Sequence, residues 1–198
     1  MVEFTHRQPE PPILQNYREN HPDALPADFG SLPFQPVKRE ARRNLNEDQF
    51  GLCAYCESIL LPNEGHIDHI KPKGGPNAHP ALAFVYTNYA HSCSVNQKHC
   101  GHQKGGGLLP IEPGQNCSRR FAIGTNGSID AALINSTNQV RHQVRQTRDM
   151  LGLNQPSLVR ERERWINNSL ILLKESAELF ESFIADKPYR FILRQLLV

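Results

Sequence analysis

The sequence predicts a small α+β protein in which short strands are followed by a predominantly helical C-terminal part. Between residues 51 and 73, turn-forming residues alternate with short apolar runs, which is typical of hairpins. Between residues 157 and 185, apolar residues recur at steps of three, four or seven, which predicts an amphipathic helix. A length of 198 residues suits one domain with appendages.

The composition excludes several classes of protein. The apolar share is 38% and the formal net charge is +2, so the chain carries no strongly charged tail. No run approaches the roughly 18 consecutive apolar residues of a membrane-spanning helix. The first residues lack the apolar core of a signal peptide, so we expect a cytoplasmic protein. Five cysteines in that setting indicate thiols or metal ligands instead of disulfides.

The N-terminal third divides into a proline-rich lead-in and a charged helix. Seven of the fifteen prolines lie in residues 1–36, and we predict an extended or irregular N-terminal arm over 1–37. The segment 37–50 reads as a helix with a basic side. The basic side is formed by Lys38, Arg39, Arg42 and Arg43. We interpret it as a solvent-exposed face, and nucleic-acid contact is the second interpretation.

Turn signals and periodicity predict the remaining elements. Residues 60–65 read as a hairpin turn, and 66–70 as the returning strand. Residues 84–92 read as a short helix or turn. An Asn-Gly pair predicts a hairpin over 121–130. The later segments predicted as helices are 131–151, 157–185 and a short last one at 189–197.

Two cysteine pairs predict a structural zinc site. Cys53 and Cys56 have the spacing of a zinc knuckle, and Cys93 and Cys100 form a second pair with a wider spacing. A structural zinc ion is bound tetrahedrally by four ligands, with no coordination position left open. Two cysteine pairs on separate turns can provide these four ligands. Three histidines remain open as replacements for one cysteine, namely His91, His99 and His102. Cys117 stands apart, without a partner at knuckle spacing.

A second set of polar residues lies between and just beyond these pairs. It consists of Asp68-His69, then Asn88, then His102. At these residues the sequence resembles the HNH endonucleases, which build a ββα-metal motif and often nest it inside a four-cysteine knuckle. The resemblance is closer still to the HNH subunit of Septu-type antiphage systems, including retron-associated versions. The stretches that carry it are Cys53-Ala-Tyr-Cys56-Glu57, His66-Ile-Asp-His-Ile-Lys-Pro-Lys73, Tyr86-Thr-Asn-Tyr-Ala-His-Ser-Cys93 and Cys100-Gly-His-Gln-Lys-Gly105.

The resemblance implies the domains and the roles at the site. It places an HNH nuclease domain with its zinc knuckle at 38–110, followed by a hairpin and a helical region at 111–198. Asp68 and His102 are implied to hold a catalytic Mg²⁺ or Mn²⁺ ion. His69 is implied to be the general base, and Asn88 to orient the imidazole or brace the loop.

Strand geometry complicates this site and adds a further histidine. On a regular strand Asp68 and His69 point to opposite faces, so both serve one site only where the strand ends or bulges. His66 shares the face of Asp68, and it is therefore a rival metal ligand or a phosphate contact.

Basic residues flank the predicted site. Lys71, Lys73 and Lys104 are predicted to contact phosphates without reading sequence. A row of arginines at 141, 145 and 148 is a further candidate for nucleic-acid contact. The alternating charges of 160–164 are interpreted as ion pairs on a helix surface.

These observations together predict a divalent-metal-dependent HNH endonuclease that cleaves nucleic acid, with DNA favoured over RNA. The resemblance further implies an effector of bacterial antiphage defence beside an ABC/SMC-like ATPase subunit, in some versions with a retron reverse transcriptase and its RNA and DNA. Two alternatives stay open. One is cleavage of RNA or tRNA by the same fold, and the other is a non-catalytic zinc module that binds nucleic acid or a partner.

Overall fold

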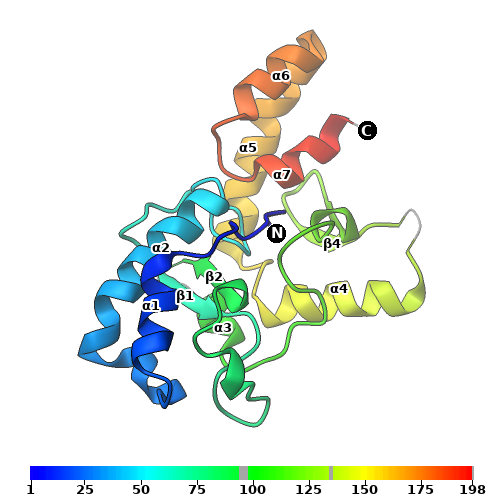
Figure 1. The fold of residues 1–198 in the computed structure, drawn as a ribbon. Helices are drawn as coiled ribbons and strands as arrows, with labels where there is room; N and C mark the ends of the chain where they lie inside the picture. The colour runs from blue at the N-terminus through cyan, green and yellow to red at the C-terminus, as the bar shows by residue number, and fades with distance from the viewer. Residues whose placement is uncertain (94–97, 134–135, 198) are drawn as a thin grey trace.

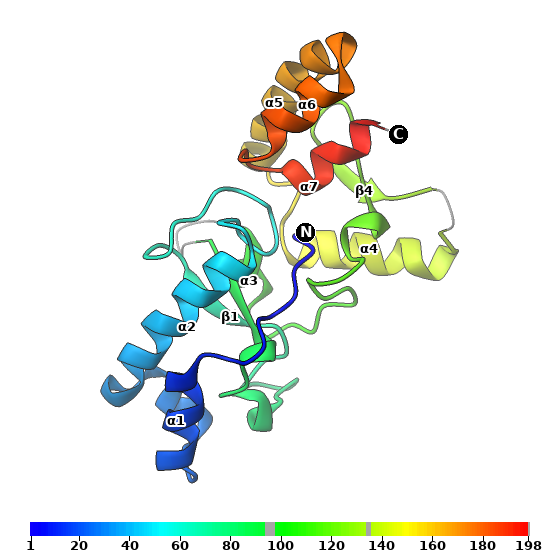
Figure 2. The ribbon, with the colours of Figure 1, turned by 45° about the horizontal axis from the view of Figure 1, so that its top comes forward.

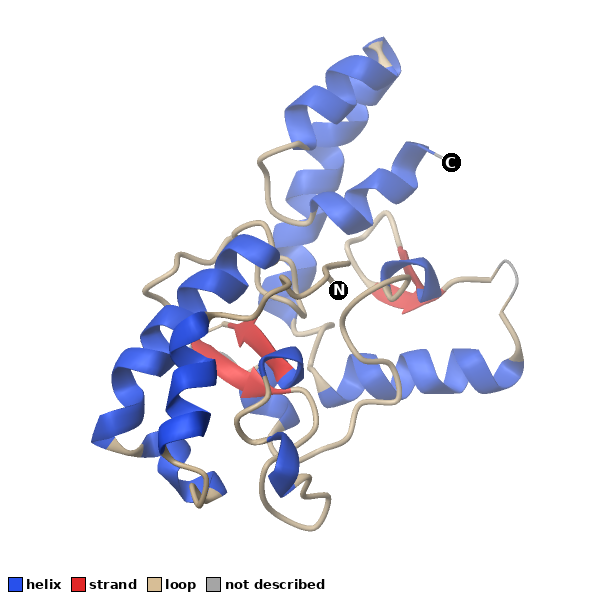
Figure 3. Ribbon diagram, in the orientation of Figure 1, coloured by secondary structure: helices blue, strands red, loops and turns tan. Residues whose placement is uncertain are grey.

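The fold is described from a computed structural model, which places residues 1–93, 98–133 and 136–197. It is a mostly helical α+β fold, as predicted, and its two small sheets each contain two antiparallel strands (Figures 1 and 3). The strands are β1 (His66–His69), β2 (Tyr89–Ser92), β3 (Phe121–Ile123) and β4 (Ile129–Ala131). The helices are α1 (Pro12–Asn20), α2 (Gln35–Asp48), α3 (Cys100–Lys104), α4 (Asn138–Met150), α5 (Pro156–Glu175), α6 (Ala177–Ile184) and α7 (Arg190–Leu193).

The N-terminal segment is more regular than predicted. Helix α1 begins at Pro12, because a proline in the first helical turn loses no hydrogen bond and has its φ already set for the helix. Its buried residues Leu14 and Tyr17 pack with Phe34 and Val37 in one apolar cluster. The helix predicted over 37–50 is confirmed as α2.

The strand β1 pairs with β2 and not with the segment before it. Ile67 lies opposite His91, and Asp68 lies opposite Ala90. The predicted hairpin around 60–65 was therefore wrong, and an isolated bridge between Leu52 and Ile59 is all the pairing found ahead of it. The segment 84–92 contains a helical turn at Tyr86–Asn88 followed directly by β2. All four residues of β2 are buried, so the sequence shows no alternation that would reveal a strand.

The C-terminal half keeps most of the predicted elements. The hairpin at 121–130 is confirmed as β3 and β4, and Gly127 in its turn has a φ of +79°. The helix predicted from residue 131 begins later, at α4, where the Thr137 side chain accepts a hydrogen bond from the Val140 amide. The single helix predicted over 157–185 is two helices, because Ser176 ends α5 and caps α6.

The elements form two neighbouring parts. Helices α1 and α2 lie beside β1, β2 and α3 (Figures 1 and 2). On the other side of the N-terminus lie α4, β4 and α7. Helices α5 and α6 project away from both groups. Within the described ranges, no helix combines the length and the apolar character that a membrane crossing requires.

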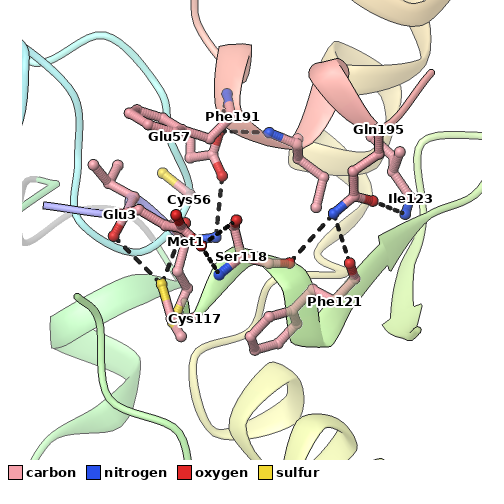
Figure 4. A network of polar contacts seen from close by, with 12 residues as sticks. Met1, Glu3, Cys56, Glu57, Cys117, Ser118, Phe121, Ile123, Phe191 and Gln195 are labelled. Atoms are coloured by element: carbon pink, nitrogen blue, oxygen red, sulfur yellow. Dashed lines mark hydrogen bonds and ion pairs between the residues drawn. The ribbon is translucent and has the colours of Figure 1, made fainter. Parts of the chain in front are cut away.

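A buried carboxylate joins the two parts. Glu57 accepts hydrogen bonds from the backbone amides of Phe191 and Ile192, both at 3.1 Å (Figure 4). Its other oxygen lies 3.0 Å from the buried amino group of Met1. Since Glu57 follows Cys56 directly, the cysteine-bearing turn is held against the start of α7.

Candidate active site and metal centre

Four cysteines meet in one buried cluster. Their sulfur atoms all lie within 4.8 Å of one another, and the cysteines are Cys53, Cys56, Cys93 and Cys100. None of them forms a disulfide. Zinc–sulfur bonds of about 2.3 Å in a tetrahedron place the sulfur atoms about 3.8 Å apart. The cluster therefore has the size and donor set of one zinc ion.

The protonation behaviour of the thiols agrees with that donor set. Hydrogen bonds from the neighbouring thiols, with Cys100 first, hold the pKa of Cys56 well below its usual range. Burial raises the pKa of Cys100. A bound Zn²⁺ ion would supply the positive charge that stabilises the four thiolates together.

The three histidines left open as zinc ligands are placed differently. Both ring nitrogens of His91 are occupied, by the side-chain amide of Asn46 at 3.2 Å and the Glu64 carbonyl at 2.8 Å. The Nδ1 atom of His99 lies 3.0 Å from the Cys100 sulfur. The His102 side chain is exposed. Cys117 stands apart, as predicted, and donates to the Met1 and Val2 carbonyls.

The carboxylate of Asp68 is buried next to this cluster. It accepts a hydrogen bond of 2.5 Å from the hydroxyl of Tyr55, which lies between the two cysteines of the knuckle. The Lys104 ammonium is 3.2 Å from the same oxygen. Burial raises the pKa of Asp68 to about 6, against the opposing effect of Lys104. The knuckle thereby orients the carboxylate.

The imidazole of His69 is held in one tautomer. Its Nε2 atom lies 3.0 Å from the Ala83 carbonyl, and a carbonyl only accepts hydrogen bonds. Nε2 therefore carries the proton, and Nδ1 carries the lone pair. Burial, followed by the ammonium groups of Lys73, Lys104 and Lys38, lowers the pKa of His69 to about 4. The ring is thus neutral near pH 7, the form that a general base requires.

Asp68 and His69 keep the alternation of a strand. The partners of Asp68 lie on the knuckle and α3, whereas His69 contacts Ala83 and packs edge-on against the Phe29 ring at 4.4 Å between centroids. The strand ends at His69 without a bulge, and the side chains of Asp68 and His69 point to opposite faces. The Lys104 ammonium spans the two residues, since it also donates to the His69 carbonyl at 2.8 Å.

Asn88 braces the backbone around the imidazole. Its side-chain oxygen accepts from the Lys71 amide at 2.8 Å, and its side-chain nitrogen donates to the Lys71 and Leu82 carbonyls at 3.0 and 3.2 Å. These bonds fix the segment after β1 to the segment before Ala83. The carbonyl that orients His69 is therefore held in place by Asn88.

Helix α3 approaches β1 at Gly101. A Cβ atom at Gly101 would lie 2.9 Å from the Asp68 side chain and 3.0 Å from the Nε2 atom of His66. His66 is half-buried, and its Nδ1 atom has no hydrogen-bond partner among the residues described. Burial lowers the pKa of His66, and the charge of nearby His102 lowers it further. Asp68 and His66 thus share the side of the hairpin that Gly101 of α3 approaches.

A hydrolytic cation at this end of β1 would have few protein ligands. Apart from the cysteine cluster, no three of the described histidines, cysteines and carboxylates lie close enough together to share an ion. Magnesium is usually held by one or two protein groups, and water and phosphate fill its other positions. The carboxylate of Asp68 and the exposed imidazole of His102 are the residues that would hold the ion.

The predicted phosphate contact of Lys104 was wrong. Its side chain is 0% exposed and its ammonium pairs with Asp68. Gly101 and Lys104 are three residues apart on α3, so the close approach at Gly101 turns Lys104 inward. Lys71 and Lys73 remain half-buried and reach solvent.

Two residues that shape the site were not predicted from the sequence. Tyr55 contacts the Asp68 carboxylate, and its position inside the knuckle spacing was the available signal. Phe29 packs on His69 from a segment interpreted as irregular, where nothing in the sequence pointed to the site.

Replacing Gly101 by alanine is expected to reduce any cleavage activity at least tenfold and to leave the cysteine cluster intact. The added methyl group displaces Asp68 and His66, while the backbone conformation suits alanine. Gly106→Ala is the matched control, because its nearest neighbour would be 3.9 Å away. Cleavage rates and metal content of the two variants are the measurements. Equal rates for both variants would contradict the close approach of α3.

The fold and site define a class of protein that builds a strand pair and a short helix on a four-cysteine cluster, with an Asp-His pair at the strand end. No family model matches the chain. It is 37% identical, over 99% of both chains, to a protein of Vibrio cholerae serotype O1 biovar El Tor named "Retron Vc95 putative HNH endonuclease". The chain belongs to the HNH endonuclease family.

Proposed function

We propose that this protein is a divalent-metal-dependent HNH endonuclease that hydrolyses phosphodiester bonds, with DNA as the favoured substrate. The observation that carries the proposal is the place of His69 directly after the buried Asp68 at the end of β1, with its Nε2 atom 3.0 Å from the Ala83 carbonyl. This leaves the Nδ1 lone pair to take a proton from an attacking water.

The other residues have complementary roles. Asp68 and His102 would hold the divalent cation, which would stabilise the charge that develops on the phosphoryl and leaving oxygens. Tyr55 and Lys104 orient the Asp68 carboxylate. Asn88 fixes the backbone that orients His69. The four cysteines would hold a structural zinc ion, which would keep Tyr55 and α3 in position.

The biological setting follows from the relative. Its name places it with a retron, and the match extends over the full length of both chains. We therefore propose that this chain is the cytoplasmic effector of a retron-associated antiphage complex. An ABC/SMC-like ATPase subunit is the proposed partner, together with a retron reverse transcriptase and its RNA and DNA. The segment before α2 and the C-terminal helices are the proposed docking surfaces.

The test is cleavage of DNA and RNA pools by the wild type and by His69→Ala, alone and with the ATPase. We expect cleavage with Mg²⁺ or Mn²⁺, none in chelator, and a loss of roughly 10²–10⁴-fold in His69→Ala, as is typical for a general base. Nucleic-acid binding is expected to survive in the variant.

Two results would redirect the proposal. If the protein cleaves only RNA, then RNA is the substrate in place of DNA, and the proposed mechanism is unchanged. Binding without cleavage in every combination, including the complex with the ATPase, would make the chain a non-catalytic zinc module.

A further inference from the structure

One aromatic ring gathers three groups from three separate segments. Phe29 lies in the helical turn Pro26–Gly30, and its ring packs against His69 at 4.4 Å between centroids. The Lys38 ammonium, from α2, lies 4.8 Å from the centre of the same ring. The Lys73 ammonium, from the segment after β1, lies 5.8 Å from it. Two cations therefore lie next to the imidazole that the proposed mechanism uses as a base.

These two cations have no acidic partner. Among the described residues, no carboxylate forms an ion pair with Lys38 or Lys73. Other basic residues do have such partners, since Arg145 and Arg148 both pair with Asp130. This difference makes the arginine row on α4 a weaker candidate for an anion contact than the two lysines.

The position of Lys38 has an electrostatic cost. Both lysines are half-buried, so water screens their repulsion less than on an open surface. Burial, followed by the charges of Arg42 and Lys73, lowers the pKa of Lys38. The cation–π contact with the Phe29 ring offsets part of that cost. An anion that contacts both ammonium groups would stabilise this pair of like charges further.

We propose that Lys38 and Lys73, held over the Phe29 ring, form a phosphate subsite that positions the nucleic-acid backbone beside His69. The proposal rests on the proposed function and adds a positioning residue, Lys38, which α2 contributes from outside the strand pair and α3. A phosphate contacts both ammonium groups without its base being read, so the subsite favours the backbone over any sequence.

The test measures binding in the His69→Ala background, so that the probe stays uncut. A labelled single-stranded DNA, and an RNA of the same sequence, are titrated over a range of salt concentrations. Each lost phosphate contact lowers the slope of log K against log salt by about 0.7 for a single strand. We expect Lys38→Met to lower the slope by that amount and to weaken binding about tenfold at low salt.

A second variant controls for charge alone. Arg43→Met removes one positive charge from the same helix, but Arg43 is exposed and already pairs with Glu40 at 2.7 Å. We expect its salt slope to equal that of the parent. Lys38→Arg keeps the charge and is expected to keep the slope, which separates a phosphate contact from a packing defect.

The outcomes separate the subsite from the function. An unchanged slope in Lys38→Met, in a protein whose wild type cleaves nucleic acid, overturns the subsite and leaves the endonuclease in place. Equal losses in Lys38→Met and Arg43→Met also overturn it, since the effect is then one of net charge. A wild type that neither binds nor cleaves DNA or RNA overturns both proposals.

Discussion

Replacing Cys56 by serine is expected to unfold the protein. A zinc ion bound by the four cysteine thiolates would contribute on the order of 10 kcal/mol to folding, whereas a whole domain is stable by roughly 5–15 kcal/mol. The knuckle also holds Tyr55 against Asp68 and Glu57 against α7, so its loss reaches both parts of the molecule. Circular dichroism, thermal unfolding and zinc content per chain are the measurements.

Cys117→Ser is the matched control for the zinc ligands. Cys117 is equally buried and equally a thiol, but it donates only to the backbone carbonyls of Met1 and Val2. Serine keeps a donor at that position, so we expect wild-type zinc content and a stability change within about 1 kcal/mol. A folded, zinc-free Cys56→Ser protein would contradict the structural role of the cluster.

Replacing Arg162 by methionine is expected to destabilise the protein by about 3–5 kcal/mol. The guanidinium is 0% exposed and donates to the Gly127 carbonyl at 2.8 Å and to the Leu153 carbonyl at 2.6 Å. Methionine fills much of the space but leaves two buried carbonyls unsatisfied, at a cost of roughly 1–3 kcal/mol each. Urea unfolding of the zinc-loaded protein measures the change.

Charge adds to the effect of Arg162. Burial lowers the pKa of its guanidinium, and the nearby carboxylate of Glu57 opposes that shift. Arg164→Met removes an exposed arginine from the same helix and is expected to change stability by less than about 0.5 kcal/mol. Similar losses in the two variants would show that Arg162 is not a structural cation.

Arg162 also shows where local pattern fails. The run 160–164 alternates basic and acidic residues, and we interpreted it as ion pairs on a helix surface. Arg160 and Arg164 are exposed as expected, whereas Arg162 is in the core. The carbonyls of Gly127 and Leu153 accept hydrogen bonds from the buried guanidinium and so reduce the free-energy cost of burying it. They come from the β3–β4 turn and the α4–α5 connection. Nothing near residue 162 in the sequence indicates them.

The chain's own residues determined which chemistry is present. The cysteine spacing predicted the four-cysteine cluster, and the structure brings those four sulfur atoms together. The Asn-Gly turn and the apolar periodicity predicted the C-terminal hairpin and helices, because hydrogen bonding and burial of these elements depend on neighbours a few residues away. The Asp68-His69 pair pointed to the family to which the chain belongs.

Only the tertiary structure decided which side chains lie around Asp68 and His69 and what each of them contacts. The pairing of β1 with β2, the inward turn of Lys104 and the approach of Phe29 and Lys38 to His69 all join residues far apart in the chain. Such contacts depend on which surfaces are buried together, and a buried ammonium or an all-buried strand has no local signature. The residue types specify the available donors, and packing determines which of them face one another.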